Sequence, residues 1–198
     1  GTFGLEADIL STGRTSQWVA ALAGKKPDEL SAVAKLAPPG SEGVLFAPYL
    51  SGGEQSVLWD PKLSGGILGL SCSHDISHIV RAHYEGICYE AKRCIDAFAK
   101  NDFTVKRVLL SGPVTRDSFF MQLMADILDM VCVASDQDSA SAYGAAMLAG
   151  MCAEKLGWDF AAGNQEHQIS FTADRDVARK YVLYYKRYLK AAAKMRIG

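Results

Sequence analysis

Gly65-Gly66-Ile67-Leu68-Gly69-Leu70, followed by His78-Ile79 and Ala82-x-Tyr84-Glu85, is the stretch of sequence that decides the fold. Its apolar segment, 67–70, is typical of a strand, and Ser73 and Asp75 are suitable cap and first-turn residues for a helix behind it. Apolar residues then recur every three or four positions up to Phe98, as they do in a helix with one buried face. The stretch predicts a strand, a turn and the longest helix of the chain.

Outward from this stretch, short apolar segments alternate with helical patterns. Strands are predicted at residues 5–10, 44–47, 108–110 and 131–134, and further helices at 13–22, 27–36, 117–128, 139–156 and 177–194. From residue 105 onward the alternation is typical of βαβ units, which place helices on both faces of a sheet with parallel strands. We expect one α/β domain over residues 1–198, with 51–64 and 159–168 as surface excursions.

Composition excludes several classes of protein. The 198 residues are 49% hydrophobic and carry a net charge of -1, so no basic footprint indicates nucleic acid or an anionic membrane. No apolar segment approaches the ~18 residues that cross a bilayer. Five cysteines without C-x-x-C spacing predict buried free thiols and a cytoplasmic location. The chain begins at Gly1, without Met, inside a strand-like segment, and we expect a fragment of a longer polypeptide.

Two residue types raise the question of other chemistry. His74 and His78 are one helical turn apart and His83 follows, but no further ligand has matching spacing, so no metal site is expected. Cys88 and Cys94 have no neighbouring basic residue in the sequence that would lower a thiol pKa. We interpret both as core residues and assign no catalytic residue within this chain.

The stretch from Ile67 to Glu90 resembles the second signature of the FGGY carbohydrate kinases, with His83 where a smaller residue is usual. Upstream, residues 48–54 and Trp59-Asp60-Pro61 resemble the xylulokinase-like branch. The resemblance implies an actin-like ATPase (ribonuclease H-like) domain, with a mixed sheet and helices on both faces. It also implies transfer of the γ-phosphoryl group of ATP, with Mg²⁺, to a sugar or polyol hydroxyl in a cleft between two such domains.

The junction between strand 108–110 and the next helix is where a ligand is expected. In an open α/β sheet, ligands bind at the carboxyl ends of strands, where glycine allows close approach and helix N–H groups are free. Ser111-Gly112-Pro113-Val114 and the helix that contains Gln122 and Ala125-Asp126 resemble the adenosine motif of the family, although the family usually has glycine at Ser111 or Pro113. Candidate nucleotide-binding residues are Ser111, Gly112, Pro113, Val114 and Asp117.

A second group of candidates lies near the start of the chain. Residues 11–18 resemble the glycine-containing helix start that approaches the nucleotide ribose and phosphates in glycerol kinases, which adds Gly13, Ser16 and Gln17 to the candidate nucleotide-binding residues. The same residues are also consistent with a simple capped helix start. The small residues between Ala142 and Ala149 resemble a family helix next to the adenosine turn, and we assign them a packing role.

Other parts of the family pattern are not recognisable here. The family base is an aspartate in a turn before a Gly-Thr-Ser phosphate turn, and Gly1-Thr2 is too close to Gln17 to be that turn. The resemblance implies that the sugar binds mainly to the absent N-terminal domain. We expect the C-terminal nucleotide-side domain of a kinase for a xylulose-like ketose, inactive as an isolated fragment and associating into a homodimer. The alternative is a non-catalytic actin-like module that binds a nucleotide or a protein.

Overall fold

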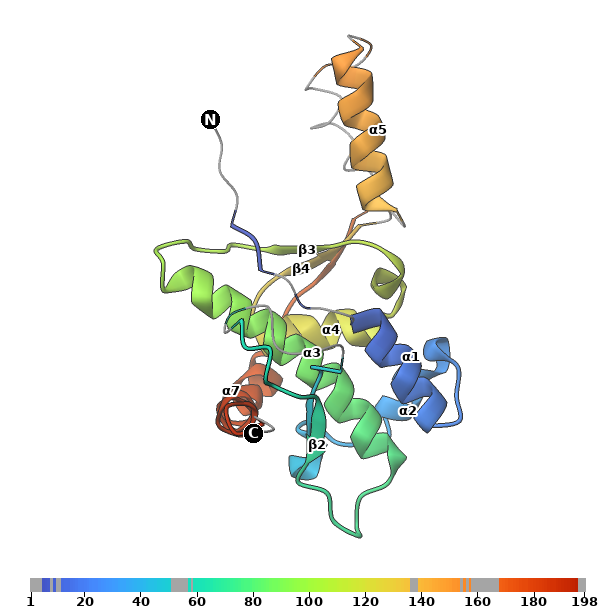
Figure 1. Ribbon diagram of the computed structural model, residues 1–198, viewed down its shortest axis with the longest axis vertical. Helices are drawn as coiled ribbons and strands as arrows, with labels where there is room; N and C mark the ends of the chain where they lie inside the picture. The colour runs from blue at the N-terminus through green and yellow to red at the C-terminus, as the bar shows by residue number, and fades with distance from the viewer. Residues whose placement is uncertain are drawn as a thin grey trace.

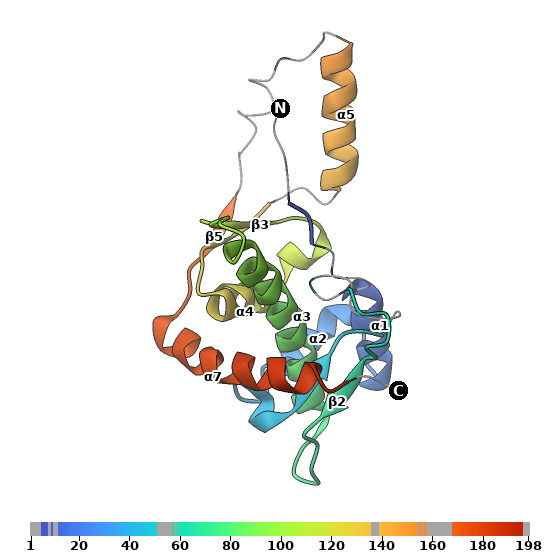
Figure 2. The ribbon, with the colours of Figure 1, turned by 60° about the vertical axis from the view of Figure 1, so that its left-hand side comes forward.

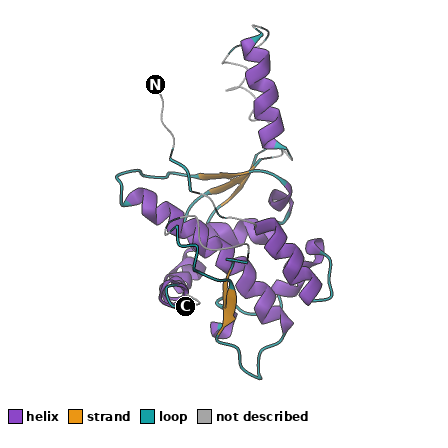
Figure 3. Cartoon of the chain, in the orientation of Figure 1, coloured by secondary structure: helices purple, strands orange, loops and turns teal. Residues whose placement is uncertain are grey.

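The structure, a computed structural model, describes residues 5–7, 9, 12–50, 57, 59–135, 139–153, 155, 157 and 168–195 (Figure 1). The predicted strand at 5–10 lies partly outside these residues, and its described positions are not in a strand. Helices and short 3-10 turns dominate the chain (Figure 3). In chain order the elements are α1 Thr12–Leu22, η1 Pro27–Glu29, α2 Leu30–Ala34, η2 Ser41–Gly43, β1 Leu45–Ala47, β2 Gly66–Leu68, α3 Ile76–Ala99, β3 Val108–Leu110, η3 Pro113–Arg116, α4 Ser118–Leu128, β4 Cys132–Ala134, α5 Ala140–Cys152, β5 Ile169–Phe171 and α7 Arg175–Ala192.

Helix α3 is the centre of the molecule. It begins after Asp75, whose side chain accepts a hydrogen bond from the Ser77 N–H, so Asp75 is the cap and Ser73 lies outside the helix. Every residue from Val80 to Glu90 is buried, because α2, β1 and α4 pack around this part of the helix. The signature stretch thus supplies the core, as the sequence predicts.

Gly86 of the signature is required by packing. A Cβ at this position would lie 2.2 Å from the Phe46 carbonyl oxygen of β1, closer than any side chain allows. The β1 backbone therefore lies directly against α3. Strand β2 pairs antiparallel with β1, with Ile67 opposite Phe46, so β1 connects the two halves of the signature.

A separate sheet has the order β3-β4-β5. Strands β3 and β4 are parallel, with Leu109 opposite Val133, and β5 is antiparallel to β4. This mixed sheet with its helices confirms the predicted fold class. Strand β5 was not predicted, because Ile169 and Phe171 are the only apolar residues of a three-residue strand and give too short a pattern to recognise.

Helix α5 differs from the rest of the molecule. Both ribbon views show it extending away from the packed body, beyond the three-stranded sheet (Figures 1 and 2). None of its thirteen residues is buried. The edge strands of the sheet are also open, since Leu109 on β3 is 57% exposed and Ile169 on β5 is 65% exposed.

Buried charge joins α3 to α7. One carboxylate oxygen of Glu85 accepts hydrogen bonds from the Gly40 N–H, from Arg81 Nε at 2.9 Å and from the Tyr181 hydroxyl at 2.9 Å. Burial raises the pKa of Glu85, and Arg81 opposes that change. One turn further along α3, Glu90 accepts from the Tyr188 hydroxyl. These contacts fix α7 against α3.

The cysteine prediction is only partly right. All five cysteines are free, and Cys88, Cys94 and Cys132 are buried, but Cys72 and Cys152 are exposed because one lies in the turn before α3 and the other at the end of α5. Burial raises the pKa of Cys88 well above its usual value, which suits a core residue. Among the helices in the described ranges, none has the length and apolar character to cross a membrane.

Candidate nucleotide site

The turn after β3 has the geometry that the sequence predicts. Gly112 has φ of 89°, a conformation that favours glycine, and Pro113 begins the 3-10 turn η3 behind it. Ser111 and Pro113 are not among the described residues with positive φ, so the turn does not require glycine at either position. The two departures from the family pattern are therefore compatible with this backbone.

Thr115 connects this turn to the end of the neighbouring strand. Its hydroxyl lies 2.9 Å from the Gly112 carbonyl oxygen and 3.2 Å from that of Ser135, while the Ser135 N–H donates to the Leu110 carbonyl. The carboxyl ends of parallel β3 and β4 are thus held together beneath the turn. A ligand is expected at such an edge of an open α/β sheet.

Asp117 has a structural role at the start of α4. One carboxylate oxygen accepts from the N–H groups of Phe119 and Phe120, and the other accepts from the Tyr84 hydroxyl at 3.2 Å. Burial, with a further contribution from Asp117, raises the pKa of Tyr84 above its usual value, so the tyrosine stays protonated and donates. A direct nucleotide contact by Asp117 stays a prediction.

The second group of candidates lies on the first turns of α1. Gly13 is exposed, and a Cβ built there meets no atom within 4 Å. The Gln17 side chain is also exposed. Ser16 is partly buried, and its hydroxyl lies 3.1 Å from the Thr12 carbonyl oxygen and 2.9 Å from His83 Nε2.

His83 joins the two groups of candidates. It is completely buried, beside Phe46 and Tyr84, and burial lowers its pKa to about 4, so the imidazole is neutral at pH 7. Ser16 contacts His83 while Asp117 contacts Tyr84, the next residue of α3. The two groups therefore converge on the middle of α3, although no hydrogen bond in the described part of the chain joins them directly.

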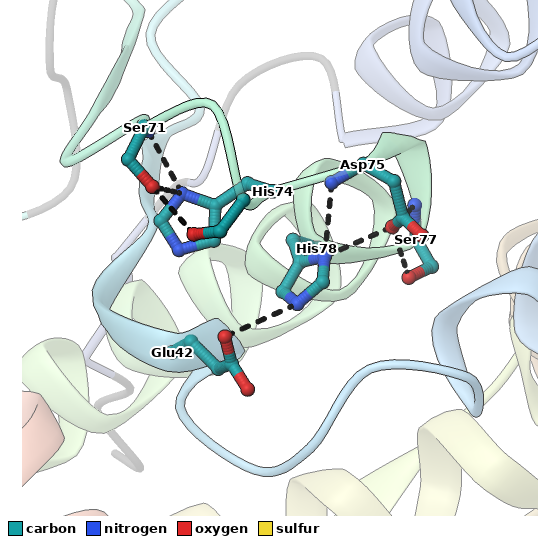
Figure 4. Close-up of polar contacts among 7 residues, drawn as sticks. Glu42, Ser71, His74, Asp75, Ser77 and His78 are labelled. Carbon is teal, nitrogen blue, oxygen red and sulfur yellow. Dashed lines mark hydrogen bonds and ion pairs between the residues drawn. The ribbon is translucent and has the colours of Figure 1, made fainter.

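His74 and His78 form a polar cluster at the start of α3 (Figure 4). Their rings are 5.1 Å apart, and His78 contacts Asp75 at 2.9 Å and Glu42 at 3.7 Å. Hydrogen bonds from Ser77 and then His78 lower the pKa of Asp75 to about 2. The described residues contain no group of three or more suitable side chains that could hold a metal ion.

A cavity of about 590 Å³ lies elsewhere, between residues 64–68, which include β2, and the end of α7. It shares no residue with the predicted nucleotide site. The cavity was not predicted from the sequence. The six basic residues between positions 177 and 195, with no acidic residue among them, did indicate a positively charged surface there. Lining residues are Ser64, Gly65, Leu68, Arg187, Lys190, Ala191, Lys194 and Met195.

The hydrogen bonds of His83 and Thr115 were not predicted from the sequence either. The sequence marked His83 only as a departure from the family pattern, and nothing in the spacing indicated that Ser16, 67 positions away, would contact it. Thr115 lies in the turn region, but its bond to Ser135 depends on the pairing of β3 with β4. Both contacts are tertiary and leave no periodic pattern.

Sequence comparison identifies relatives that are sugar and polyol kinases. A gluconokinase from Bacillus subtilis (strain 168) is 35% identical over 122 residues, covering 61% of this chain and 24% of the relative. A xylulose kinase from the same organism is 30% identical over 112 residues, covering 57% and 22%. This chain spans about a quarter or less of the length of these relatives.

Solved structures share the fold. The ligand-bound xylulose kinase from Lactobacillus acidophilus has a TM-score of 0.80 at 24% identity and covers 92% of this chain and 39% of its own. Plasmodium falciparum glycerol kinase with ADP has a TM-score of 0.76 at 23% identity, with coverage of 94% and 37%. The family model for the C-terminal domain of the FGGY family of carbohydrate kinases matches residues 1–153. The chain therefore belongs to the FGGY family of carbohydrate kinases and carries its C-terminal domain.

Proposed function

We propose that this chain is the nucleotide-side part of an ATP-dependent carbohydrate kinase that phosphorylates a sugar or polyol hydroxyl. The observation that carries the proposal is the Gly112 turn, at the carboxyl ends of two parallel strands and directly before α4. Such a turn admits a nucleotide closely because glycine has no side chain. The exposed Gly13 and Gln17 on α1 supply the second side of the site.

The described residues fit a nucleotide better than they fit a free metal ion. Pro113 and Val114 present an exposed, partly apolar surface for a base, and Gln17 offers a side-chain amide for ribose or phosphate. Mg²⁺ is usually held by substrate phosphates and only one or two carboxylates, so the lack of a metal cluster among the described residues is compatible with Mg²⁺ arriving with ATP. Bound ATP supplies the transferable phosphoryl group.

Within the site, we assign His83, Tyr84 and Asp117 to positioning. Neutral His83 supports the first turn of α1 through Ser16, and the Tyr84 hydroxyl supports the cap of α4 through Asp117. His83 and Tyr84 both belong to one buried segment of α3. The two sides of the nucleotide site are therefore fixed relative to one another before a ligand binds.

For the acceptor, we propose a xylulose-like ketose, bound mainly by an N-terminal domain of a longer cytoplasmic protein. The xylulokinase-like residues at 48–54 and 59–61 favour it over gluconate and glycerol, the acceptors named for other relatives. This chain alone should not phosphorylate xylulose, because no candidate base lies within it. Measurable xylulose phosphorylation by this chain would refute that part of the proposal.

Calorimetric titration of this chain with ADP tests the site. Binding is expected, and Gln17→Ala should weaken it about tenfold, the effect of losing one hydrogen bond to a charged phosphate. Gln168→Ala removes an exposed amide outside the site and should leave the affinity unchanged. An absence of heat at millimolar ADP, or equal effects of the two variants, would contradict the proposed site.

A further inference from the structure

The cavity beside the end of α7 carries an unbalanced positive charge. Arg187 and Lys190 of α7 line it together with Lys194, which lies just beyond the end of the helix at Ala192; the three are spaced three and four residues apart. Like charges at these spacings repel one another. Among the described residues, none forms an ion pair with any of the three, and no acidic one lines the cavity.

The rest of the cavity lining is mainly apolar. Leu68 of β2, Ala191 and Met195 line it, and Met195 packs so closely on Gly66 that a Cβ there would lie 2.5 Å from the methionine methyl group. The Ser64 N–H donates to the Met195 carbonyl, which holds the segment before β2 against the end of α7. The volume of about 590 Å³ is in the range of small-molecule sites.

From these features we infer that the cavity is a second binding site, for a small organic anion that carries two or more phosphate groups. Three cations carry more positive charge than a single carboxylate or phosphate offsets. Phosphates at two positions would offset the repulsion between them. The carbon skeleton of the ligand would lie on Leu68, Ala191 and Met195. The site shares no residue with the proposed nucleotide site and does not depend on it.

Titration with inorganic tripolyphosphate tests the charged part of the site. Arg187→Ala/Lys190→Ala should weaken binding about tenfold or more, because two of three charge-assisted contacts are lost. Lys180→Ala/Lys186→Ala removes the same charge from exposed positions of α7 outside the cavity and should change the affinity less than twofold. Equal losses in the two variants would show diffuse attraction and overturn the proposal, as would no binding at millimolar tripolyphosphate.

A variant that fills the cavity tests where the ligand binds, without changing the charge of the protein. Ala191→Trp places a large side chain in the cavity and should abolish binding, whereas Ala193→Trp, exposed on the same helix end, should not. An unchanged affinity in Ala191→Trp would overturn the site. Tripolyphosphate binding that Gln17→Ala weakens and Ala191→Trp does not would belong to the nucleotide site and would overturn the second site, so the two sites give different results.

Discussion

Helices α3 and α5 differ in both burial and charge. Of the 24 residues of α3, 13 are buried, including charged side chains such as Arg81 and Glu85, whereas α5 has no charged residue and none of its thirteen residues is buried. A helix that is apolar on all sides normally lies in a core. The comparison shows that burial here follows the available partners and not side-chain polarity: α3 is enclosed by α2, β1 and α4, and α5 extends from the body.

The glycines of these two helices also differ in the space around them. Gly86 of α3 lies against the backbone of β1, whereas Gly144 of α5 has open space around it. Small residues on α5 are suited to close packing, but the described residues offer no such close neighbour at Gly144. Substitutions on the two helices should therefore differ in size and in sign.

The largest expected effect is on the buried charge of α3. Arg81→Met leaves Glu85 buried without its cation and should lower the free energy of unfolding by about 4 kcal/mol. Urea denaturation followed by circular dichroism measures this change. The double variant Arg81→Met/Glu85→Gln removes the unpaired charge and should recover part of the loss. A change below about 1 kcal/mol in the single variant would contradict a buried role for this pair.

The next largest expected effect is a loss of stability at low pH, to which His83 contributes. Its folded pKa of about 4 lies below the ordinary value of 6.5, so between these pH values the unfolded chain binds a proton that the folded chain does not. Stability should therefore fall by about 3 kcal/mol as pH decreases from 6.5 to 4. His83→Gln removes this contribution and should show a correspondingly shallower decrease. Parallel stability curves for the two proteins would exclude the assignment.

A smaller effect comes from the paired glycines. Gly86→Ala places a methyl group against the Phe46 carbonyl and should destabilise the protein by about 2 kcal/mol. Gly144→Ala meets no atom and should stabilise by up to about 1 kcal/mol, because alanine is the better helix former. Thermal unfolding of both variants measures the difference. If the two substitutions had the same sign, the packing contrast between α3 and α5 would be wrong.

The smallest expected change in stability is at the exposed face of α5. Leu148 is 58% exposed, so Leu148→Glu should alter the free energy of unfolding by no more than about 0.5 kcal/mol. It should nevertheless reduce self-association, measured by light scattering at high protein concentration, because it removes apolar surface. Leu183→Glu removes apolar surface at a similarly exposed position of α7 and is the control: an equal reduction would show that association is not specific to α5. A wild-type protein that stays monomeric would contradict the expected homodimer.

Much of the fold was predictable because periodicity and caps are local. The sequence predicted each of α1 to α5 and α7, with the start of α3 displaced to Ile76 since Asp75 is the cap. Strand β2 ends at Leu68, before the expected position, because Gly69 has a φ of 80°. The exposure of α5 was not predictable, since the sequence pattern indicates a buried helix and cannot show which surface is present to cover it.

For the candidate site, the sequence predicted the Gly112 turn but not the side-chain contacts that hold the site in place. Glycine and proline act on their own backbone, so their positions indicate a turn directly. Ser16, His83 and Thr115 act through contacts with residues distant in the sequence, and these follow only from the packing of α1 on α3 and the pairing of β3 with β4. The same limit applies to the cavity, because its cations were visible in the sequence but the apolar residues that line it beside them were not.

The buried imidazole of His83 has a practical consequence for experiments. Because it stays neutral well below pH 7, its nitrogen resonances should not titrate across the range in which kinases are normally handled. It touches Ser16 on one side and lies beside Tyr84, the partner of Asp117, on the other. A displaced His83 signal on adding a ligand would therefore report movement and not protonation, which makes this side chain a built-in spectroscopic probe of both halves of the nucleotide site.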